Sequence, residues 1–305
     1  MISLAYRSQV ELLLMVLPFV AKENIFALKG GTAINLFERD LPRLSVDIDL
    51  TYTRIDSRDL ALRNINDALL NIKKAIENTY SDIHVIAVPK GEGADVKLHC
   101  QSKKAQIKIE VNTVTRGILF PSRLMQVSES VQTTFNKFAA ISVVSHEELF
   151  GGKMCAAIDR QHPRDIFDMK LLLEQEGLTP KVLHGFLFML LSHYKPIHEL
   201  LSPKLKDQQS AFDSQFKGMT FIDFSYSDYS NCRTQLFDLI KKSFSDDEKN
   251  FIISFENGEP NWELFPENIS IFPAIQWKLQ NIQLLKKENP SKQTIYMNEL
   301  KRILE

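Results

Sequence analysis

Phe26-Ala-Leu-Lys-Gly-Gly-Thr-Ala-Ile-Asn-Leu-Phe37, followed by Arg43-Leu-Ser-Val-Asp-Ile-Asp-Leu50, is the stretch that decides the fold of this chain. Its pattern predicts a buried strand, a tight turn, a short helix and a second strand. Gly30 and Gly31 end the first strand, and Thr32 is a suitable cap for the helix. Two glycines at a helix N-terminus also let main-chain N–H groups approach a phosphate without side-chain interference.

The second strand carries two carboxylates on one face. Because successive side chains of a strand point to opposite faces, Asp47 and Asp49 share a face with Arg43 and Ser45. Two carboxylates this close repel each other unless a cation lies between them, and hard oxygen ligands suit Mg²⁺. Taken separately, Gly30-Gly31 is most simply an ordinary turn, and the pair Asp47 and Asp49 is most simply a solvated strand edge. Their combination instead favours phosphoryl or nucleotidyl transfer.

The composition is that of a soluble globular protein, and it allows one large domain or two. The chain has 305 residues, 44% hydrophobic and 25% charged. The 37 Lys and Arg residues balance the 38 Asp and Glu residues, so overall charge does not indicate a nucleic-acid partner. Three scattered cysteines predict a reduced, cytoplasmic setting. No apolar run is long enough to span a bilayer, so no membrane partner is expected.

The first half of the chain has the periodicities of an α/β region. Its helix over 57–80 has Ser57 as the expected cap, and Pro89-Lys-Gly-Glu-Gly93 is expected to be a turn. The other expected elements are a helix over 8–23 and strands over 83–88, 96–100, 105–112 and 138–144.

A third carboxylate lies on the strand predicted over 105–112. Ile107, Ile109 and Val111 occupy one face of this strand, and Glu110 occupies the other. If the strand neighbours the aspartate pair, Glu110 completes a three-carboxylate site that holds two metal ions and helps to activate an attacking hydroxyl. The alternative is a half-solvated strand with one exposed acid.

Beyond residue 144 the pattern becomes almost entirely helical. Ser145-His-Glu-Glu148 is a capping-box pattern that opens the first of these helices. The sequence therefore predicts an α+β protein with an α/β domain over 1–144 and a helical domain over 145–305. The segment 200–229 is polar and irregular, and it is expected to be a loop or an arm. The predicted helices cover 147–159, 163–174, 180–194, 228–242, 246–255, 271–287 and 293–304.

The helix–turn–helix over 147–168 carries a second set of polar residues. Lys153 and Arg160 are seven residues apart and lie on nearly one face, while Arg164 and Asp168 follow in the next helix. Lysine as a point charge and arginine as a bidentate fork are both suited to holding a triphosphate. The alternative is a solvated network of ion pairs, for example Arg164 with Asp168. Gly151-Gly152 either permits close helix packing or interrupts the helix.

Four motifs resemble, in the same order, those of the AbiEii/AbiGii-type nucleotidyltransferase toxins, which belong to the DNA polymerase β-like nucleotidyltransferase superfamily. The resemblance covers about 26–173, and the remainder is similar only in its helical character. It implies a polymerase-β-like N-terminal domain with a mixed sheet, followed by a mainly helical C-terminal domain. The motifs are Ala27-Leu-Lys-Gly-Gly-Thr32, Ser45-Val-Asp-Ile-Asp49, Ile107-Lys-Ile-Glu-Val-Asn112, and Glu148 with Lys153, Arg160 and Arg164-Asp-Ile-Phe-Asp168.

The resemblance also implies roles for individual residues. Asp47 and Asp49 match the metal-binding pair, Lys153 matches the functional lysine, and Asp165 or Asp168 matches the acidic residue after the arginine. Mg²⁺, as two ions, and an NTP are the implied cofactor and substrate. Glu110 stands where the wider superfamily commonly has aspartate. The full set expected to carry catalysis or to bind metal and nucleotide is Gly30, Gly31, Thr32, Ser45, Asp47, Asp49, Glu110, Lys153, Arg160, Arg164 and Asp168.

Members of this family are typically toxins of bacterial toxin–antitoxin or phage-abortive systems. The resemblance implies NMP transfer to an acceptor hydroxyl, first of all a tRNA 3′ end, and a cognate antitoxin as partner. Lys204-Leu-Lys206, Lys241-Lys242 and Lys286-Lys287 either contact RNA phosphates or are solvated helix ends. Two alternatives stay open: a protein side chain as the acceptor, which would make the reaction an adenylylation, and a catalytically silent binding protein.

Overall fold

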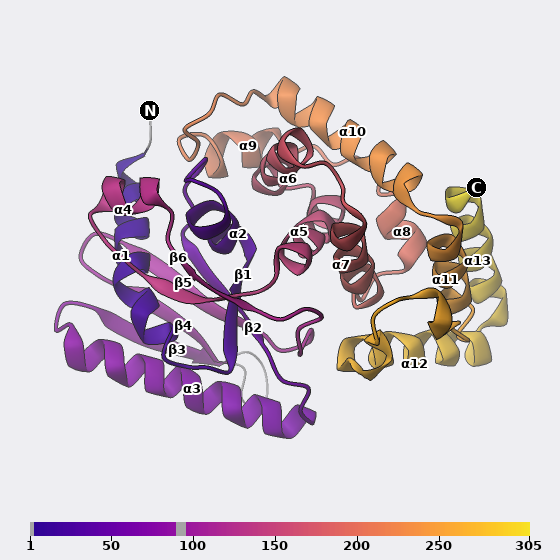
Figure 1. Ribbon diagram of the computed structural model, residues 1–305, viewed down its shortest axis with the longest axis horizontal. Coiled ribbons are helices and arrows are strands. Elements are labelled where there is room, and N and C mark those ends of the chain that lie inside the picture. Colours follow the sequence, from indigo (N-terminus) through magenta and orange to yellow (C-terminus); the bar gives the residue numbers. More distant parts are fainter. Residues whose placement is uncertain (1–2, 90–95) are drawn as a thin grey trace. The chain divides into compact units, whose positions relative to one another are not determined.

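The computed structural model describes residues 3–89 and 96–305 (Figure 1). Two compact units form the chain, one from residues 1–149 with 213–224 and the other from 150–212 with 225–305. The predicted α+β class is confirmed, since one mixed sheet is combined with many helices. No helix in the described part combines the length and the apolar character needed to cross a bilayer.

The first unit contains a mixed sheet that has seven strands among the described residues. β2 pairs in parallel with β5, and β1 pairs in parallel with β7, while the remaining neighbours are antiparallel. In the order in which they lie, the strands are β3 (His84–Pro89), β4 (Val96–Gln101), β5 (Gln106–Asn112), β2 (Asp47–Tyr52), β1 (Phe26–Lys29), β7 (Ala140–Val143) and β6 (Arg123–Gln126).

Most strands lie where the sequence predicts them, and β6 was missed. β6 forms an edge of the sheet and has mostly exposed side chains, so it shows no alternation of apolar and polar residues. The turn expected over 89–93 lies outside the described residues apart from Pro89. The prediction that the second strand starts at Arg43 is wrong, since β2 starts at Asp47. Residues before Asp47 pair instead with the distant segment 219–221 through an Arg43–Thr220 bridge.

The glycine turn differs in detail from the prediction. Helix α2 (Gly30–Ala33) follows β1 directly and continues as a π-helical turn, η1 (Ile34–Glu38). Thr32 was expected to cap this helix, but it lies buried inside the first turn. The helix starts earlier because Gly30 has a φ of +72°, which turns the chain sharply at the end of β1.

Three further helices belong to the first unit: α1 (Leu4–Val20), α3 (Arg58–Thr79) and α4 (Glu129–Phe135). α3 is capped as predicted, because the Ser57 hydroxyl accepts a hydrogen bond from the Leu60 N–H at 3.4 Å. Pro18 lies in the last turn of α1, where little of the helix remains to be disrupted.

The second unit is helical, as expected. α5 (His146–Arg160) passes from the first unit into the second. Pro163, Pro180, Pro273 and Pro290 each occupy a first helical position, where the absent N–H costs nothing. The remaining helices after α5 are α6 (Pro163–Gln175), α7 (Pro180–Leu191), α8 (Ile197–Leu201), α9 (Gln209–Gln215), α10 (Tyr226–Ser243), α11 (Asp246–Glu256), α12 (Pro273–Glu288) and α13 (Pro290–Leu304).

α5 is continuous through Gly151 and Gly152, so the helix is not interrupted there. The two glycines have different surroundings. A Cβ atom at Gly151 would lie 2.3 Å from the carbonyl carbon of Gly185 in α7, whereas one at Gly152 would lie 3.8 Å from the Met189 side chain. Gly151 therefore marks a backbone-to-backbone contact between α5 and α7.

We expect Gly151→Ala to lower the free energy of unfolding by about 1–3 kcal/mol, because the added methyl group must push two helix backbones apart. Gly152→Ala is the matched control and should be neutral or stabilising by up to about 1 kcal/mol, since alanine favours the helix. Urea unfolding of the two variants measures the difference. Equal stability of the two proteins would contradict the close contact.

Candidate active site

Asp47 and Asp49 lie half-buried on one face of β2, while Ile48 and Leu50 on the other face are buried. The parallel pairing with β5 places Asp49 opposite Glu110 and Asp47 opposite Lys108. On the other side, the antiparallel pairing with β1 places Asp49 opposite Lys29. The carboxylates of β2 are therefore flanked on both sides by charged residues of the same sheet face.

Glu110 lies beside Asp49, but lysines hold its carboxylate. Its two oxygens lie 2.5 Å from Lys97 Nζ and 3.0 Å from Lys108 Nζ. Burial alone would raise the pKa of Glu110, but the hydrogen bonds and charges of the two lysines lower it to about 2. Within residues 3–89 and 96–305, no three histidine, cysteine or acidic side chains are arranged to hold one metal ion. The structure thus brings Glu110 to the acidic face as part of an ion-pair cluster.

The two glycines lie directly against this face. A Cβ atom at Gly30 would lie 2.7 Å from Asp49 Oδ2. A Cβ atom at Gly31 would lie 2.9 Å from both Ser45 Oγ and Arg43 Nη2. The Asp49 carboxylate therefore packs directly against the backbone at residue 30, and a side chain at that position would collide with it. Glycine at such a turn lets main-chain N–H groups approach a phosphate.

Thr32 and Ser45 connect the turn to β2. The Thr32 hydroxyl is hydrogen-bonded to the Ser45 hydroxyl at 3.0 Å, and it donates to the main-chain oxygen of Asp47 at 2.5 Å. Thr32, Ser45 and Arg43 are all buried. These contacts fix the glycine turn against the start of the acidic strand. The sequence indicated this arrangement, because Arg43, Ser45 and Asp47 are spaced two residues apart and were expected to share one face of the strand.

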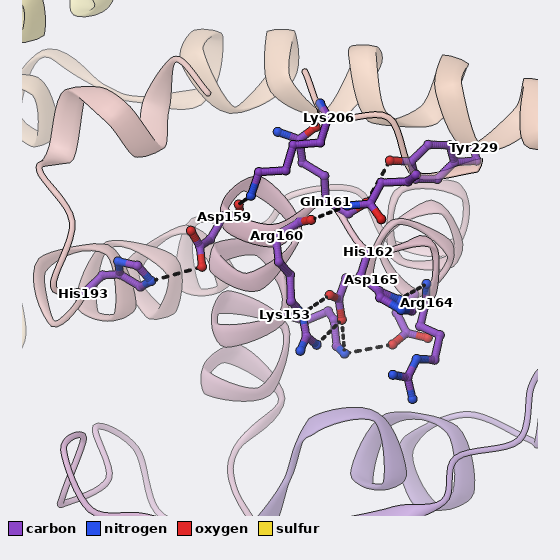
Figure 2. Close-up of polar contacts among 12 residues, drawn as sticks. Lys153, Asp159, Arg160, Gln161, His162, Arg164, Asp165, His193, Lys206 and Tyr229 are labelled. Atoms are coloured by element: carbon purple, nitrogen blue, oxygen red, sulfur yellow. Dashed lines mark hydrogen bonds and ion pairs between the residues drawn. The ribbon is translucent and has the colours of Figure 1, made fainter. Parts of the chain in front are cut away.

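A second cluster of charges lies in the second unit, where α5 meets α6 (Figure 2). Lys153 Nζ lies 2.8 Å from Asp165 Oδ1 and 3.1 Å from Asp168 Oδ2. Arg160 donates to both oxygens of Asp165, at 2.5 and 2.9 Å. Burial would raise the pKa of Asp165, but Lys153 and Arg160 hold it well below its usual value. Arg164 follows His162, whose ring accepts a hydrogen bond from the Arg164 main-chain N–H at 3.2 Å.

The cluster combines a buried part with an accessible one. Lys153 and both aspartates are at most 6% exposed, whereas the Arg160 side chain is 57% exposed. The charged residues thus form an ion-pair network, as the alternative expected, but this network is largely buried and not solvated. Lys153 is the partner shared by the two acids.

Comparison with known proteins identifies the family. The model of the family described as "Nucleotidyl transferase AbiEii toxin, Type IV TA system" matches residues 11–281. The chain belongs to this AbiEii family. It is therefore a nucleotidyltransferase enzyme of the toxin class found in type IV toxin–antitoxin systems, and the resemblance inferred from the four motifs is confirmed.

The fold has a relative among solved structures. The AbiEii chain is similar to MenT4, a nucleotidyltransferase toxin from Mycobacterium tuberculosis H37Rv, with a TM-score of 0.61 over 92% of this chain and 93% of that one. The sequences are only 12% identical, so this likeness concerns the fold. No curated protein sequence matches the chain.

Two charged residues near the acidic face of the AbiEii chain were not predicted as site residues. Lys29 is half-buried, and burial lowers its pKa while the charges of Asp49, Glu148 and Glu110 oppose that shift. Glu148 is 3% exposed and accepts the N–H groups of Leu119 at 2.8 Å and Phe120 at 3.1 Å. The signal for Lys29 in the sequence was its place just before Gly30.

Glu148 was part of the predicted capping box, and only half of that box forms. The Ser145 hydroxyl accepts the Glu148 N–H at 3.1 Å, but the Glu148 carboxylate points to the segment at 119–120. Burial raises the pKa of Glu148 to about 7, although the two N–H donors and Lys29 act against this shift.

We therefore expect stability of the AbiEii protein to depend on pH through Glu148. Because the folded-state pKa of about 7 exceeds the ordinary 4.5, the folded protein binds the extra proton, and stability falls as pH rises from about 4.5 to 7. Glu148→Gln keeps an oxygen acceptor for both N–H groups and should show a flatter profile. Urea unfolding at pH 5 and pH 7 measures this, and identical pH profiles of the two proteins would contradict it.

Proposed function

We propose that this AbiEii protein transfers an NMP from an NTP to an acceptor hydroxyl at a tRNA 3′ end, with release of pyrophosphate. Family membership supports the nucleotidyl transfer, and the resemblance supports the RNA acceptor. The observation that carries the proposal is the glycine turn packed against the acidic strand: a Cβ atom at residue 30 would lie 2.7 Å from Asp49 Oδ2, on the strand face that also presents Asp47. A glycine turn against paired carboxylates is what a phosphate with a bound divalent cation requires.

Asp47 and Asp49 are the residues that would hold Mg²⁺. Two such ions are proposed at this site. When bound there, Mg²⁺ polarises phosphoryl oxygens and neutralises their charge. The main-chain N–H groups at Gly30 and Gly31 approach the phosphates, and the hydrogen bonds of Thr32 and Ser45 keep this turn in place.

The remaining proposed site residues are supported by different observations. Glu110 joins the metal ligands only if it leaves Lys97 and Lys108. Lys153, Arg164 and Asp168 are proposed on the match to the family motifs, with Lys153 and Asp168 as catalytic residues. Arg160 donates Nε and one Nη to Asp165, but its side chain is 57% exposed, so its remaining N–H groups are the ones proposed to meet a phosphate.

The test is incubation of the protein with Mg²⁺, each α-labelled NTP and either total tRNA or a cell lysate. Label on tRNA that disappears with a chelator is the expected result. Label on a protein would replace the RNA acceptor by adenylylation, and no label on any acceptor would indicate a silent member of the family. Asp47→Ala is the inactive control.

The family also implies a partner. We propose a cognate antitoxin that counteracts the enzyme in the cytoplasm, as type IV toxin–antitoxin membership suggests, and a role of the pair in phage defence. Co-expression of the toxin with its neighbouring gene product, scored by growth, tests this part independently of the acceptor.

A further inference from the structure

The second unit contains a half-open pocket of about 620 Å³ beside the end of α5. Its walls come from α8, the loop after it, and α13. Four basic residues from three segments line it: Lys195, Lys204, Lys206 and Arg302.

The acidic residues of the pocket are largely neutralised. Asp159 is bound by Lys195 at 2.5 Å, and Glu299 is bound by Arg302 at 2.5 Å, which leaves Glu199 as the third acid. Lys206 Nζ donates to the main-chain oxygen of Asp159 at 2.7 Å. That acceptor is neutral, so it orients the ammonium group without cancelling its charge. Since Lys195 and Arg302 are engaged by two of the acids, Lys204 and Lys206 supply the positive charge that an anionic ligand would meet.

A buried glutamine holds the lysine loop in place. Gln161 is fully buried at the end of α5, where its amide donates to the main-chain oxygen of Lys204 at 2.8 Å and accepts the N–H of Lys206 at 3.0 Å. Arg233 donates to the main-chain oxygen of Lys206 at 2.6 Å. Tyr229 donates to that of Gln161 at 2.8 Å (Figure 2). The two lysines therefore project from a backbone that is fixed before any ligand arrives.

The loop also adjoins the cluster of α5 and α6. Asp159, Arg160 and Gln161 are consecutive, and Gln208 donates to the main-chain oxygen of Arg160 at 2.9 Å. The partly exposed Arg160 side chain and the lysine loop thus extend from the same turn of the chain. A ligand with several phosphates in sequence has partners at both places.

His198 adds a neutral partner to the pocket wall. Its ring lies 4.5 Å from the Tyr296 ring between centroids, and its Nδ1 is buried with no hydrogen-bond partner among the described residues. Burial lowers the pKa of His198, which favours the neutral ring. Because Nδ1 is buried, Nε2 is the ring nitrogen left for a ligand, and a ribose hydroxyl or a base edge can use such a group.

We propose that this pocket binds the sugar–phosphate backbone of the RNA acceptor, with Lys204 and Lys206 on phosphates and His198 on a ribose or a base. The inference rests on the proposed RNA acceptor and locates where that RNA is held on the second unit. An acidic peptide would also meet the lysines, but it has no ribose hydroxyl or base edge for His198, the polar aromatic side chain of the pocket lining. RNA supplies such groups together with successive phosphates.

The test is binding of fluorescein-labelled tRNA, without NTP, at several KCl concentrations. Lys204→Ala with Lys206→Ala should weaken binding about tenfold or more and reduce the slope of log K against log salt by about 1–2, as expected for two lost phosphate contacts. Both side chains are exposed, so the fold should tolerate the change. Lys181→Ala with Lys249→Ala removes two lysines of the same unit outside the pocket and should leave the slope unchanged.

Three outcomes would overturn the proposal: an unchanged salt slope in the Lys204/Lys206 variant, an equal loss in the control, or displacement of the tRNA by poly-glutamate as readily as by unlabelled tRNA. In the transfer assay the pocket variant should raise KM for tRNA and leave KM for NTP unchanged. Intact tRNA binding without any NMP transfer would instead count against the proposed function, so the two failures are distinguishable.

Discussion

Asp49→Asn should reduce NMP transfer by at least about 100-fold while the protein stays folded. Changes to residues that merely orient metal ligands already cost about 10–100-fold, and Asp49 is proposed as a ligand itself. Asparagine keeps the size of the side chain, so the packing against Gly30 is preserved and only the charge is lost. The measurement is initial rate of label transfer at saturating Mg²⁺ and NTP, with far-UV circular dichroism to verify the fold.

Two comparisons make this result specific. Asp47→Asn should show a loss of similar size, because both carboxylates lie on the same face of β2. Asp82→Asn removes an equally negative but exposed acid from the turn before β3 and should leave the rate unchanged. Full transfer by Asp49→Asn would show that the acidic face takes no part in the chemistry, whatever the family of the chain.

The arrangement at Gly30 and Asp49 was predictable because it depends on local rules. Strand alternation placed Asp47 and Asp49 on one face, and the glycine pair marked the turn before it. The sequence also predicted the strand over 105–112 and placed Glu110 on its polar face, because apolar and polar residues alternate there. What the sequence pattern did not show was the register that puts Asp49 opposite Glu110 and Lys29.

The parts that the sequence did not predict depend on contacts between distant segments. Lys97 reaches Glu110 because β4 and β5 pair in an antiparallel register, which no local pattern encodes. β2 begins late because residues before it pair with 219–221, from a segment expected to be irregular. Gly151-Gly152 allowed either a break or a close contact, and only the α7 backbone at Gly185 decides between them. Sequence reasoning fails here because tertiary partners override local preference.

Lys153→Met should lower the free energy of unfolding by about 3–5 kcal/mol, because it leaves the buried Asp165 and Asp168 carboxylates without their shared cation. Adding Asp168→Asn to this variant should recover part of the loss, since one buried charge is removed. Urea unfolding at pH 7 measures both. A Lys153→Met protein within about 1 kcal/mol of the unmodified chain would mean that Lys153 does not neutralise the cluster.

The same variant should change the dependence of stability on acid. The folded-state pKa of Asp165 lies below its ordinary 3.8, so its ionised form contributes stability that is present above about pH 4 and is lost as pH falls below it. Without Lys153 the pKa of Asp165 should rise, because burial is then opposed only by Arg160, so the variant should lose less stability than the unmodified chain as pH falls below about 4. Because the expected structural loss is this large, inactivity of Lys153→Met alone cannot establish catalysis. Lys153→Arg, which keeps the charge for Asp165 and Asp168, separates the two roles: a folded but inactive Lys153→Arg protein is the result expected of a catalytic lysine.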